Sequence, residues 1–444
     1  MKSISSKKLK GNILIPGDKS ISHRLVILSS IAIGNSKIKG LLKSDDVMRT
    51  VEAMKSFGAS INLSNSSNCF INGIGLGGLA EPKTALDFGN SGTSARLIMG
   101  LSSSHPITTL FIGDTSLSMR PMQRVLKPLI NFGSSFSLRE DEYLPAILRG
   151  SVSPIPFIFD LNEPSAQIKS AVLLGALNTP GTTIVRDKFN TRDHTERLLE
   201  LYGANISVKR KKSLKEISIK GIKDLNGIDV NVPGDPSSAL FPIVAALICE
   251  DSDIMVKNVL INPTRDGAFE VLKEMGANIN YLNHRIMAAE DVYDIRVKSS
   301  NLSGIDIPKK ISPTMIDDYP ILAVAASMAK GKTCFRGIGE LRFKESDRFN
   351  GILNLLKKNG VKVESNKDTI TIYGKKELKR GGIEISTNLD HRMAMSALVM
   401  GLISNKEIKI DNSKTIKTSF PNFYNLMIKI GAKLFKNHNG MRKI

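Results

Sequence analysis

The chain has little of what several classes of protein require. It has no Trp and only 5% aromatic residues, and none of its basic runs is interleaved with rings that could stack on bases. Its 62 Lys and Arg against 42 Asp and Glu give a formal net charge of +20, which by itself suggests a polyanionic partner. We attribute most of this excess to a Lys-rich solvated surface and predict no nucleic-acid partner. A nucleic-acid binder is the alternative, and DNA binding with a steep salt dependence would support it.

Cysteine is scarce too, and long apolar runs are lacking. Cys69, Cys249 and Cys334 have neither metal-ligand spacing nor an even count, so we predict free thiols in a reducing compartment and no metal site. No apolar run approaches the length of a membrane span, and the start MKSISSKKLKGNILIPG is charged without the apolar stretch of a signal peptide. These observations predict a soluble, cytoplasmic protein with no membrane partner.

Internal repetition is what the sequence does have. The stretch from Ile15 (IPGDKSISHRL) and the stretch from Val232 (VPGDPSSALFP) each read as strand end, Pro-Gly-Asp, small-residue helix, strand, polar loop and amphipathic helix. Four looser copies begin near Phe88, Glu163, Thr314 and Leu389. Six copies in 444 residues, about one per 74, predict a repeated α/β module closed by a hairpin. Three modules per globule would give two similar globules with a seam at Pro233-Gly234.

The helix starts of these modules carry unexpected charges. Ser, Asn and Asp at such places are ordinary N-cap residues. Capping does not explain Lys19, Arg24, Gln167, His391 and Arg392, because a cation in the first turn opposes the helix dipole. Cations recur at matching places before the second helices, at Arg120, Arg192, Lys344, Arg348 and Lys417. If these loops converge in a cleft between two globules, they would enclose a strongly anionic small molecule.

Nine motifs in order resemble one family. They are PGDKSISHR, DFGNSGTSARL, GDTSLSMRPM, SAQIKSAVLL, TRDHTE, VPGDPSSALFPIVAAL, MIDDYPILAVAA, ELRFKESDR and LDHRMAMSALVMGL. Together they resemble the 5-enolpyruvylshikimate-3-phosphate synthases from Pro16 to about Lys433. The resemblance implies an α/β fold of two globules, each of three βαβαββ units with pseudo-threefold symmetry, an inside-out α/β barrel. It also implies that residues 1–16 and 235–444 form one domain and 17–234 the other, with the active site between them.

The resemblance implies an activity as well. The enolpyruvyl group of phosphoenolpyruvate would move to the 5-hydroxyl of shikimate 3-phosphate through a tetrahedral intermediate, releasing phosphate on the route to chorismate and the aromatic amino acids. Shikimate 3-phosphate would contact Lys19, Ser20, Arg24, Ser165, Ala166, Gln167, Arg192, Asp317 and Lys344. Phosphoenolpyruvate would contact Lys19, Asn90, Gly92, Arg120, Gln167, Lys344, Arg348 and Arg392. We predict that Glu345 handles the C3 proton and that Asp317 takes the hydroxyl proton, with Lys19 shuttling protons nearby. We expect a monomer without a metal or an organic cofactor.

Three positions bear on this resemblance. Many members have Lys directly before TFP, whereas here Thr418 stands at that place, so we assign no role to Lys417. Gly92 indicates either a turn with positive φ or close approach by a ligand, and in having Gly at this place the chain resembles the glyphosate-sensitive members.

The alternative family is the UDP-N-acetylglucosamine enolpyruvyl transferases. They carry a reactive Cys in the loop corresponding to GDTSLSMRPM, where this chain has none.

Overall fold

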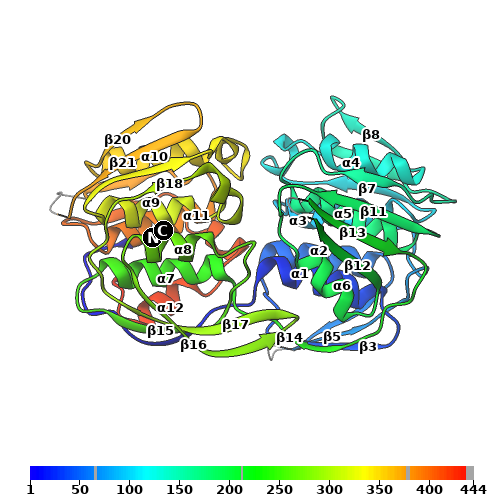
Figure 1. Cartoon of the computed structure of the whole chain (residues 1–444), viewed down its shortest axis with the longest axis horizontal. Coiled ribbons are helices and arrows are strands. Elements are labelled where there is room, and N and C mark those ends of the chain that lie inside the picture. Colours follow the sequence, from blue (N-terminus) through cyan, green and yellow to red (C-terminus); the bar gives the residue numbers. More distant parts are fainter. Residues whose placement is uncertain (65–67, 212–213, 377–380, 437–444) are drawn as a thin grey trace, which may run out of the picture. The chain divides into compact units, whose positions relative to one another are not determined.

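The computed structural model describes residues 1–64, 68–211, 214–376 and 381–436. The chain divides into two compact units, and Figure 1 shows both. Unit 1 holds Met1–Pro16, Gly234–Arg285 and the chain from Asp291 onward, and unit 2 holds Gly17–Pro233 and Ile286–Glu290. The chain therefore passes between the units at Pro16-Gly17 and Pro233-Gly234, and a short excursion at 286–290 was not predicted. None of the described helices is both long and apolar enough to cross a membrane.

Unit 2 is built from three modules, each with a strand, a buried helix, a strand, a second helix and a hairpin. The first contains β14 (Asp229–Asn231), α1 (Lys19–Ile31), β3 (Asn35–Lys39), α2 (Asp45–Ser56), β4 (Ser60–Leu63) and β5 (Asn68–Asn72). The second contains β6 (Leu86–Asp87), α3 (Gly92–Ser102), β7 (Thr108–Ile112), α4 (Gln123–Leu129), β8 (Ser135–Arg139) and β9 (Tyr143–Arg149). The third contains β10 (Ile158–Asp160), α5 (Ala166–Leu177), β11 (Thr182–Asp187), α6 (His194–Leu201), β12 (Asn205–Lys211) and β13 (Leu214–Lys220).

Unit 1 repeats the same plan three times. Its first module contains β2 (Lys10–Leu14), α7 (Pro236–Ile248), β15 (Asp253–Leu260), α8 (Gly267–Glu274), β16 (Asn278–Met287) and β17 (Glu290–Lys298). Its second contains β18 (Asp306–Ile307), α9 (Tyr319–Met328), β19 (Gly331–Arg336), α10 (Arg348–Lys358), β20 (Lys362–Ser365) and β21 (Thr369–Gly374). Its third contains β22 (Ile383–Ile385), α11 (His391–Gly401), β23 (Ile408–Ile410), α12 (Phe423–Lys429), β24 (Leu434–Phe435) and β1 (Lys2–Ser3).

Two modules exchange their first strands. Strand β2 directly precedes α1 in the sequence, yet it pairs in parallel with β15 in the module of α7. Strand β14 precedes α7, yet it pairs in parallel with β3 in the module of α1. The N-terminal strand β1 likewise pairs with β23 and β24 and completes the sixth sheet. Each described sheet has four strands, and the βαβαββ order predicted for the modules is confirmed.

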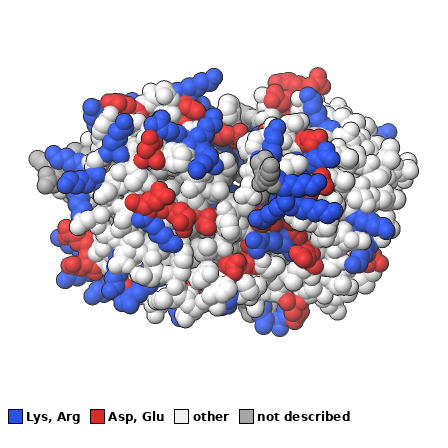
Figure 2. All heavy atoms as spheres, viewed as in Figure 1, with Lys and Arg blue, Asp and Glu red and all other residues white. Residues whose placement is uncertain are grey.

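The first helix of each module is buried along nearly its whole length and lies inside the sheets, which is what makes each barrel inside-out. Helix α7 is apolar on all sides and is buried along its whole length, as a helix without a polar face has to be. The sheets instead alternate, as in β9, where buried and exposed residues follow one another. On the face drawn in Figure 2, basic and acidic side chains are interspersed over both units.

The second helices of the six modules all end in the same way. A glycine with positive φ follows the second helix in every module, directly or after a short 3₁₀ turn or cap residue. These residues are Gly58, Gly133, Gly203, Gly276, Gly360 and Gly431, with φ between 72° and 105°. Glycine is favoured there because other residues in the left-handed region bring Cβ close to the backbone. The repeated glycine thus stops each helix before its hairpin.

Candidate functional site

The buried helices of unit 2 begin where the motifs predict. Asp18, Ser91 and Ser165 are the N-cap residues of α1, α3 and α5, and each side chain accepts a hydrogen bond from the backbone N–H three residues later. The first turn of none of these three helices contains an acidic residue. Capping therefore accounts for the polar residues at these helix starts but not for Lys19.

Arg24 is held where three helices meet. Its side chain is nearly buried, and Nε donates to Thr195 Oγ1 at 2.7 Å while Nη2 donates to Ser170 Oγ at 2.8 Å. The two hydroxyl groups are hydrogen-bonded to each other at 2.7 Å. Nη1 donates to the carbonyl oxygen of Ser20 at 3.0 Å. Helices α1, α5 and α6 thus fix one guanidinium group from three sides.

Lys19 forms an ion pair with Asp46 of α2, with 2.7 Å between Nζ and Oδ2. His23, one turn further along α1, is fully buried and contacts Thr50 Oγ1 through Nδ1 at 2.7 Å. Burial, and then the charges of Lys19 and Arg24, lower the pKa of His23 well below its ordinary value. The first two turns of α1 therefore carry two cations and a neutral imidazole at pH 7.

Arg120 and Gly92 are close together. Arg120 Nη2 donates to Asn90 Oδ1 at 2.6 Å and to Ser116 Oγ at 3.2 Å. A Cβ atom on Gly92 would lie 3.3 Å from Arg120 Nη1 and 3.0 Å from Arg96 Nη1. Gly92 does not have a positive φ, so the turn interpretation is wrong. A methyl group at this position would fit only if the two guanidinium groups shifted by a few tenths of an ångström.

Arg96 is a residue that the sequence reasoning missed. Its Nη1 donates to Gln167 Oε1 at 2.7 Å, and Gln167 Nε2 donates to Thr93 Oγ1 at 3.0 Å. Arg96 is nearly buried and lies one turn after Gly92 in the motif NSGTSARL. An Arg inside a helix of mostly small and apolar residues was the sequence signal that could have drawn attention to it, although its burial is visible only in the folded structure.

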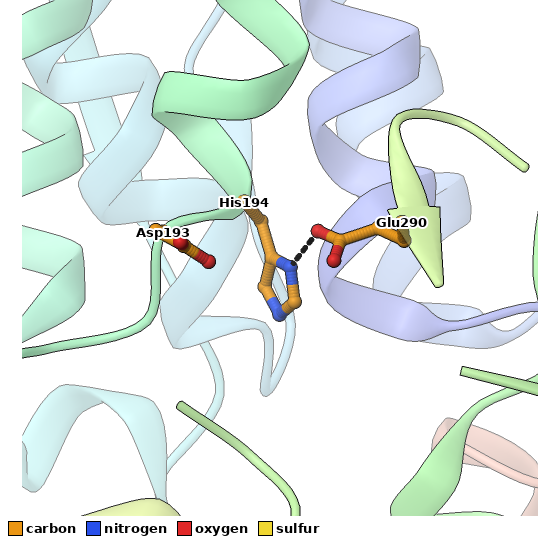
Figure 3. A group of neighbouring side chains, drawn as sticks. All are labelled: Asp193, His194 and Glu290. Carbon is orange, nitrogen blue, oxygen red and sulfur yellow. Dashed lines mark hydrogen bonds and ion pairs between the residues drawn. The ribbon is translucent and has the colours of Figure 1, made fainter. Parts of the chain in front are cut away.

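A charged cluster surrounds the start of α6 (Figure 3). His194 Nδ1 lies 2.7 Å from Glu290 Oε1, and Asp193 lies on the other side of the ring. These three residues offer ligand atoms within 4.8 Å of one another. However, Arg197 already pairs with both carboxylates, at 3.2 Å from Asp193 and 3.7 Å from Glu290, and Lys215 lies 3.8 Å from Asp193. A divalent cation would be repelled by these two side chains, so we interpret the group as a network of ion pairs.

The site residues of unit 1 centre on Arg348, which is fully buried at the start of α10. Its guanidinium group lies 2.7 Å from Glu345 Oε2, 3.3 Å from Asp317 Oδ1 and 2.8 Å from Asp390 Oδ2. Burial lowers the pKa of Arg348, but the charges of Asp390, Glu345 and Asp317 outweigh burial and raise it. Lys344 Nζ is 3.5 Å from Asp317 Oδ1. One permanent cation therefore holds the two carboxylates that we predict to be catalytic.

Arg392 joins the same group from α11. Its Nη1 donates to the carbonyl oxygen of Asp317 at 3.0 Å and to Asp318 Oδ1 at 2.8 Å. Burial raises the pKa of Asp318, and the charge of Arg392 opposes this rise. Asp390 is both the N-cap of α11 and a partner of Arg348. Sequence reasoning treated Asp390 as a cap and missed its second contact.

Lys417 remains outside this group of contacts. It lines a separate hollow of unit 1 with Asp411, Lys414 and Tyr424. Thr418 Oγ1 lies 3.3 Å from His391 Nδ1, at the start of α11. The difference from the family pattern concerns the single position of Thr418. Nothing in the structure assigns a role to Lys417.

Each unit therefore gathers its own share of the predicted residues. Unit 2 carries Lys19, Ser20, Arg24, Asn90, Gly92, Arg120, Ser165, Ala166, Gln167 and Arg192. Unit 1 carries Asp317, Lys344, Glu345, Arg348 and Arg392, which form one connected set of contacts. Unit 2 is rich in cations and helix starts, whereas the group in unit 1 combines cations with carboxylates.

Comparison with known proteins agrees with this architecture. A solved structure of an EPSP synthase from Acinetobacter baumannii matches with a TM-score of 0.86 and 38% identity, covering 97% of this chain and 98% of that one. The enolpyruvyl transferase NikO from Streptomyces tendae matches with a TM-score of 0.77 at 17% identity and covers 97% of both chains, which shows a shared fold. The fold is that of the enolpyruvyl transferases.

Sequence relatives are more specific. A protein of Chelativorans sp. (strain BNC1) named 3-phosphoshikimate 1-carboxyvinyltransferase is 49% identical over 436 residues, 98% of this chain and 97% of its own. One with the same name from Zymomonas mobilis is 48% identical over 429 residues, 96% of this chain and 95% of its own. The family model EPSP synthase (3-phosphoshikimate 1-carboxyvinyltransferase) matches residues 4–427. The chain belongs to this family, which confirms the resemblance over the UDP-N-acetylglucosamine alternative.

Proposed function

We propose that the two groups of residues described above, one in each unit, bind the substrates and carry out the reaction of a 3-phosphoshikimate 1-carboxyvinyltransferase. The enzyme transfers the enolpyruvyl group of phosphoenolpyruvate to the 5-hydroxyl of shikimate 3-phosphate and releases phosphate. One observation supports the roles that we give to the two carboxylates. The Arg348 guanidinium group pairs with both Asp317 and Glu345, and Lys344 pairs with Asp317. Two carboxylates held by one cation supply the separate proton-transfer groups that an addition and elimination reaction needs.

The substrates each carry a phosphate and a carboxylate, and these need fixed cationic donors. Shikimate 3-phosphate would be bound by Arg24 and Arg192 with the start of α5, and phosphoenolpyruvate by Arg120 and Arg392. Guanidinium groups suit both anions because their N–H groups match two oxygen atoms at once. Arg24 and Arg120 are already held by neighbouring hydroxyl and amide groups, so little side-chain freedom is left to lose on binding.

In the reaction, the 5-hydroxyl oxygen forms a bond to C2 of phosphoenolpyruvate while C3 gains a proton. Asp317 would accept the hydroxyl proton, and Glu345 would donate the proton to C3. Loss of that proton to Glu345 and departure of phosphate from C2 then restore the double bond. Lys19 and Lys344 would stabilise the negative charge that develops on the phosphate and carboxylate oxygens.

A phosphate-release assay tests the proposed activity. Purified protein should release inorganic phosphate when phosphoenolpyruvate and shikimate 3-phosphate are both present, and none when either is omitted. Release with UDP-N-acetylglucosamine in place of shikimate 3-phosphate would contradict the proposal.

Arg192→Ala should weaken binding of shikimate 3-phosphate more than binding of phosphoenolpyruvate. Loss of one charge-assisted contact is expected to cost about 1.5 to 3 kcal/mol, seen as a rise in KM for shikimate 3-phosphate. The matched control is Arg186→Ala, which removes a part-exposed Arg of the same module that pairs with Glu216. An equal loss for both substrates would show that Arg192 is not specific to one of them.

Gly92→Ala should weaken glyphosate inhibition more than it raises KM for phosphoenolpyruvate. The added methyl group would push Arg96 and Arg120 by a few tenths of an ångström, and an inhibitor slightly longer than the substrate would clash first. We expect wild-type inhibition to be competitive with phosphoenolpyruvate, and Ki to rise at least about tenfold more than KM, a difference of about 1.4 kcal/mol. Wild-type activity that persists in millimolar glyphosate, or equal changes in both constants, would refute this view of the pocket.

We further propose that the chain acts as a monomer in the cytoplasm. All three cysteines are buried and free, which suits a reducing compartment. A single species with a molar mass near 48.5 kDa in light scattering would support the monomer.

A further inference from the structure

Lys169 is a buried cation that the proposed mechanism does not use. It lies in α5 and is fully buried. Its Nζ donates to Asp187 Oδ2 at 3.3 Å and to the carbonyl oxygen of Thr191 at 3.2 Å, and it pairs with Glu196 Oε1 at 2.7 Å. Burying an ammonium group is unfavourable unless its partners compensate, so such a residue calls for an explanation.

The repeated fold shows that the helix itself does not need this charge. Lys169 is the fourth residue after the N-cap Ser165. The residues at the same place in the other modules are all buried and uncharged: Ser22, Ala95, Ala239, Leu322 and Ala394. Five modules fold with a small or apolar residue there. A charged residue at this position therefore occurs only in the module of α5, and the residues that Lys169 contacts indicate its role.

Those partners lie on and on either side of the loop between β11 and α6, which carries Arg192: Asp187 is the last residue of β11, Thr191 lies in the loop and Glu196 is in the first turn of α6. Asp187 ends β11, and its Oδ2 accepts hydrogen bonds from Thr191 N at 2.9 Å and Thr191 Oγ1 at 2.7 Å. Burial raises the pKa of Asp187, but Lys169 and these hydrogen bonds outweigh burial and lower it, so the carboxylate stays ionised. The carbonyl group of Thr191 that Lys169 binds belongs to the peptide unit directly before Arg192.

We propose that Lys169, with Asp187 and Thr191, is a positioning group for shikimate 3-phosphate: it fixes the Arg192 loop against helix α5. The same helix begins with Ser165, Ala166 and Gln167, which are assigned to that substrate. The anchor thus sets the distance between Arg192 and the start of α5 before the substrate arrives. This inference rests on the role proposed for Arg192.

Lys169→Met is the primary test. KM for shikimate 3-phosphate should rise about tenfold, as expected when a charge-assisted contact is misplaced, while KM for phosphoenolpyruvate and kcat at saturating substrate change less than about twofold. A residue that only stabilises the fold would lower the melting temperature without this split. The control is Arg186→Met, which removes a cation of β11 that pairs with Glu216 at 3.1 Å and not with the loop that carries Arg192. A similar rise in KM for shikimate 3-phosphate in Arg186→Met would overturn the proposal.

Two further variants decide the remaining outcomes. Lys169→Met with Glu196→Gln also removes the nearest carboxylate partner of Lys169, and KM for shikimate 3-phosphate should stay high. Full recovery of that KM would mean that Lys169 is only a counter-charge. If Lys169→Met does not fold, Thr191→Val, which removes one hydroxyl group, should still raise the KM for shikimate 3-phosphate about threefold. An unchanged KM would refute the anchor.

Arg192→Ala separates the role of Arg192 in substrate binding from the positioning role of Lys169. If Arg192→Ala leaves the KM for shikimate 3-phosphate unchanged, the role of Arg192 is refuted. If Arg192→Ala raises that KM and Lys169→Met does not, only the anchor is refuted.

Discussion

Glu345→Gln is expected to lower kcat by about two to four orders of magnitude, the usual effect of removing a general acid-base group. Glutamine keeps the size and the hydrogen-bonding oxygen of the side chain but cannot give or take the C3 proton. Glu345 directly follows Lys344 in the sequence, and its carboxylate lies 2.7 Å from the Arg348 guanidinium group. Substrate affinity should change little because Arg348 and Lys344 remain in place.

The measurement is steady-state kinetics with both substrates varied. Glu340→Gln is a matched control, since it neutralises an exposed carboxylate in the short 3₁₀ segment Gly339–Phe343 just before Glu345. We expect the control to retain wild-type kcat. Turnover of Glu345→Gln near the wild-type rate would show that another group handles the C3 proton. A rise in both KM values with kcat unchanged would instead assign Glu345 to binding.

Arg348→Met should destabilise the protein by about 3 to 5 kcal/mol at neutral pH. The substitution leaves Asp390, which is fully buried, close to Glu345 and Asp317 without the cation that they share. For a domain of this size such a loss corresponds to a fall in Tm of about 6 to 20 °C. Arg342→Met is the control, because Arg342 is partly exposed and its ion pair with Asp347 spans 3.8 Å. A variant as stable as the control would show that the buried ion pairs contribute nothing to stability.

The cost of Arg348→Met should depend on pH in a defined direction. In the wild type, burial raises the pKa of Asp390, but Arg348 outweighs burial and lowers that pKa below its ordinary value of about 4. This stabilisation is present above the unfolded pKa and is lost as the pH falls through the folded pKa. In the variant, burial and Glu345 would raise the pKa of Asp390, so the ionised form destabilises the fold until acid protonates it. The difference in stability should therefore be largest near pH 7 and shrink toward pH 4.

The sequence by itself determined the local parts of this protein. Six helix starts, the glycines that end the second helices and the module count were all readable, because capping and positive φ depend on residues within one turn. The cations Lys19, Arg24 and Arg120 could also be picked out in the sequence. Each is a positive charge at or near the N-terminal end of a helix, where the helix dipole disfavours it. Their predicted roles in binding stay predictions.

Tertiary structure decided what lies far apart along the chain. The pairing of β2 with β15 and of β14 with β3 joins residues more than 180 positions apart, and the motif order gave no sign of it without the family resemblance. Arg348 and Asp390 meet across 42 positions, and Lys169 meets Thr191 across 22. Hydrophobic periodicity and capping residues each describe a single helix or strand. A charged side chain, in contrast, can be buried only where folding brings partners to it that compensate for the loss of water. For that reason Arg96, Lys169 and Asp390 could be recognised as buried ionic residues only once the modules were assembled.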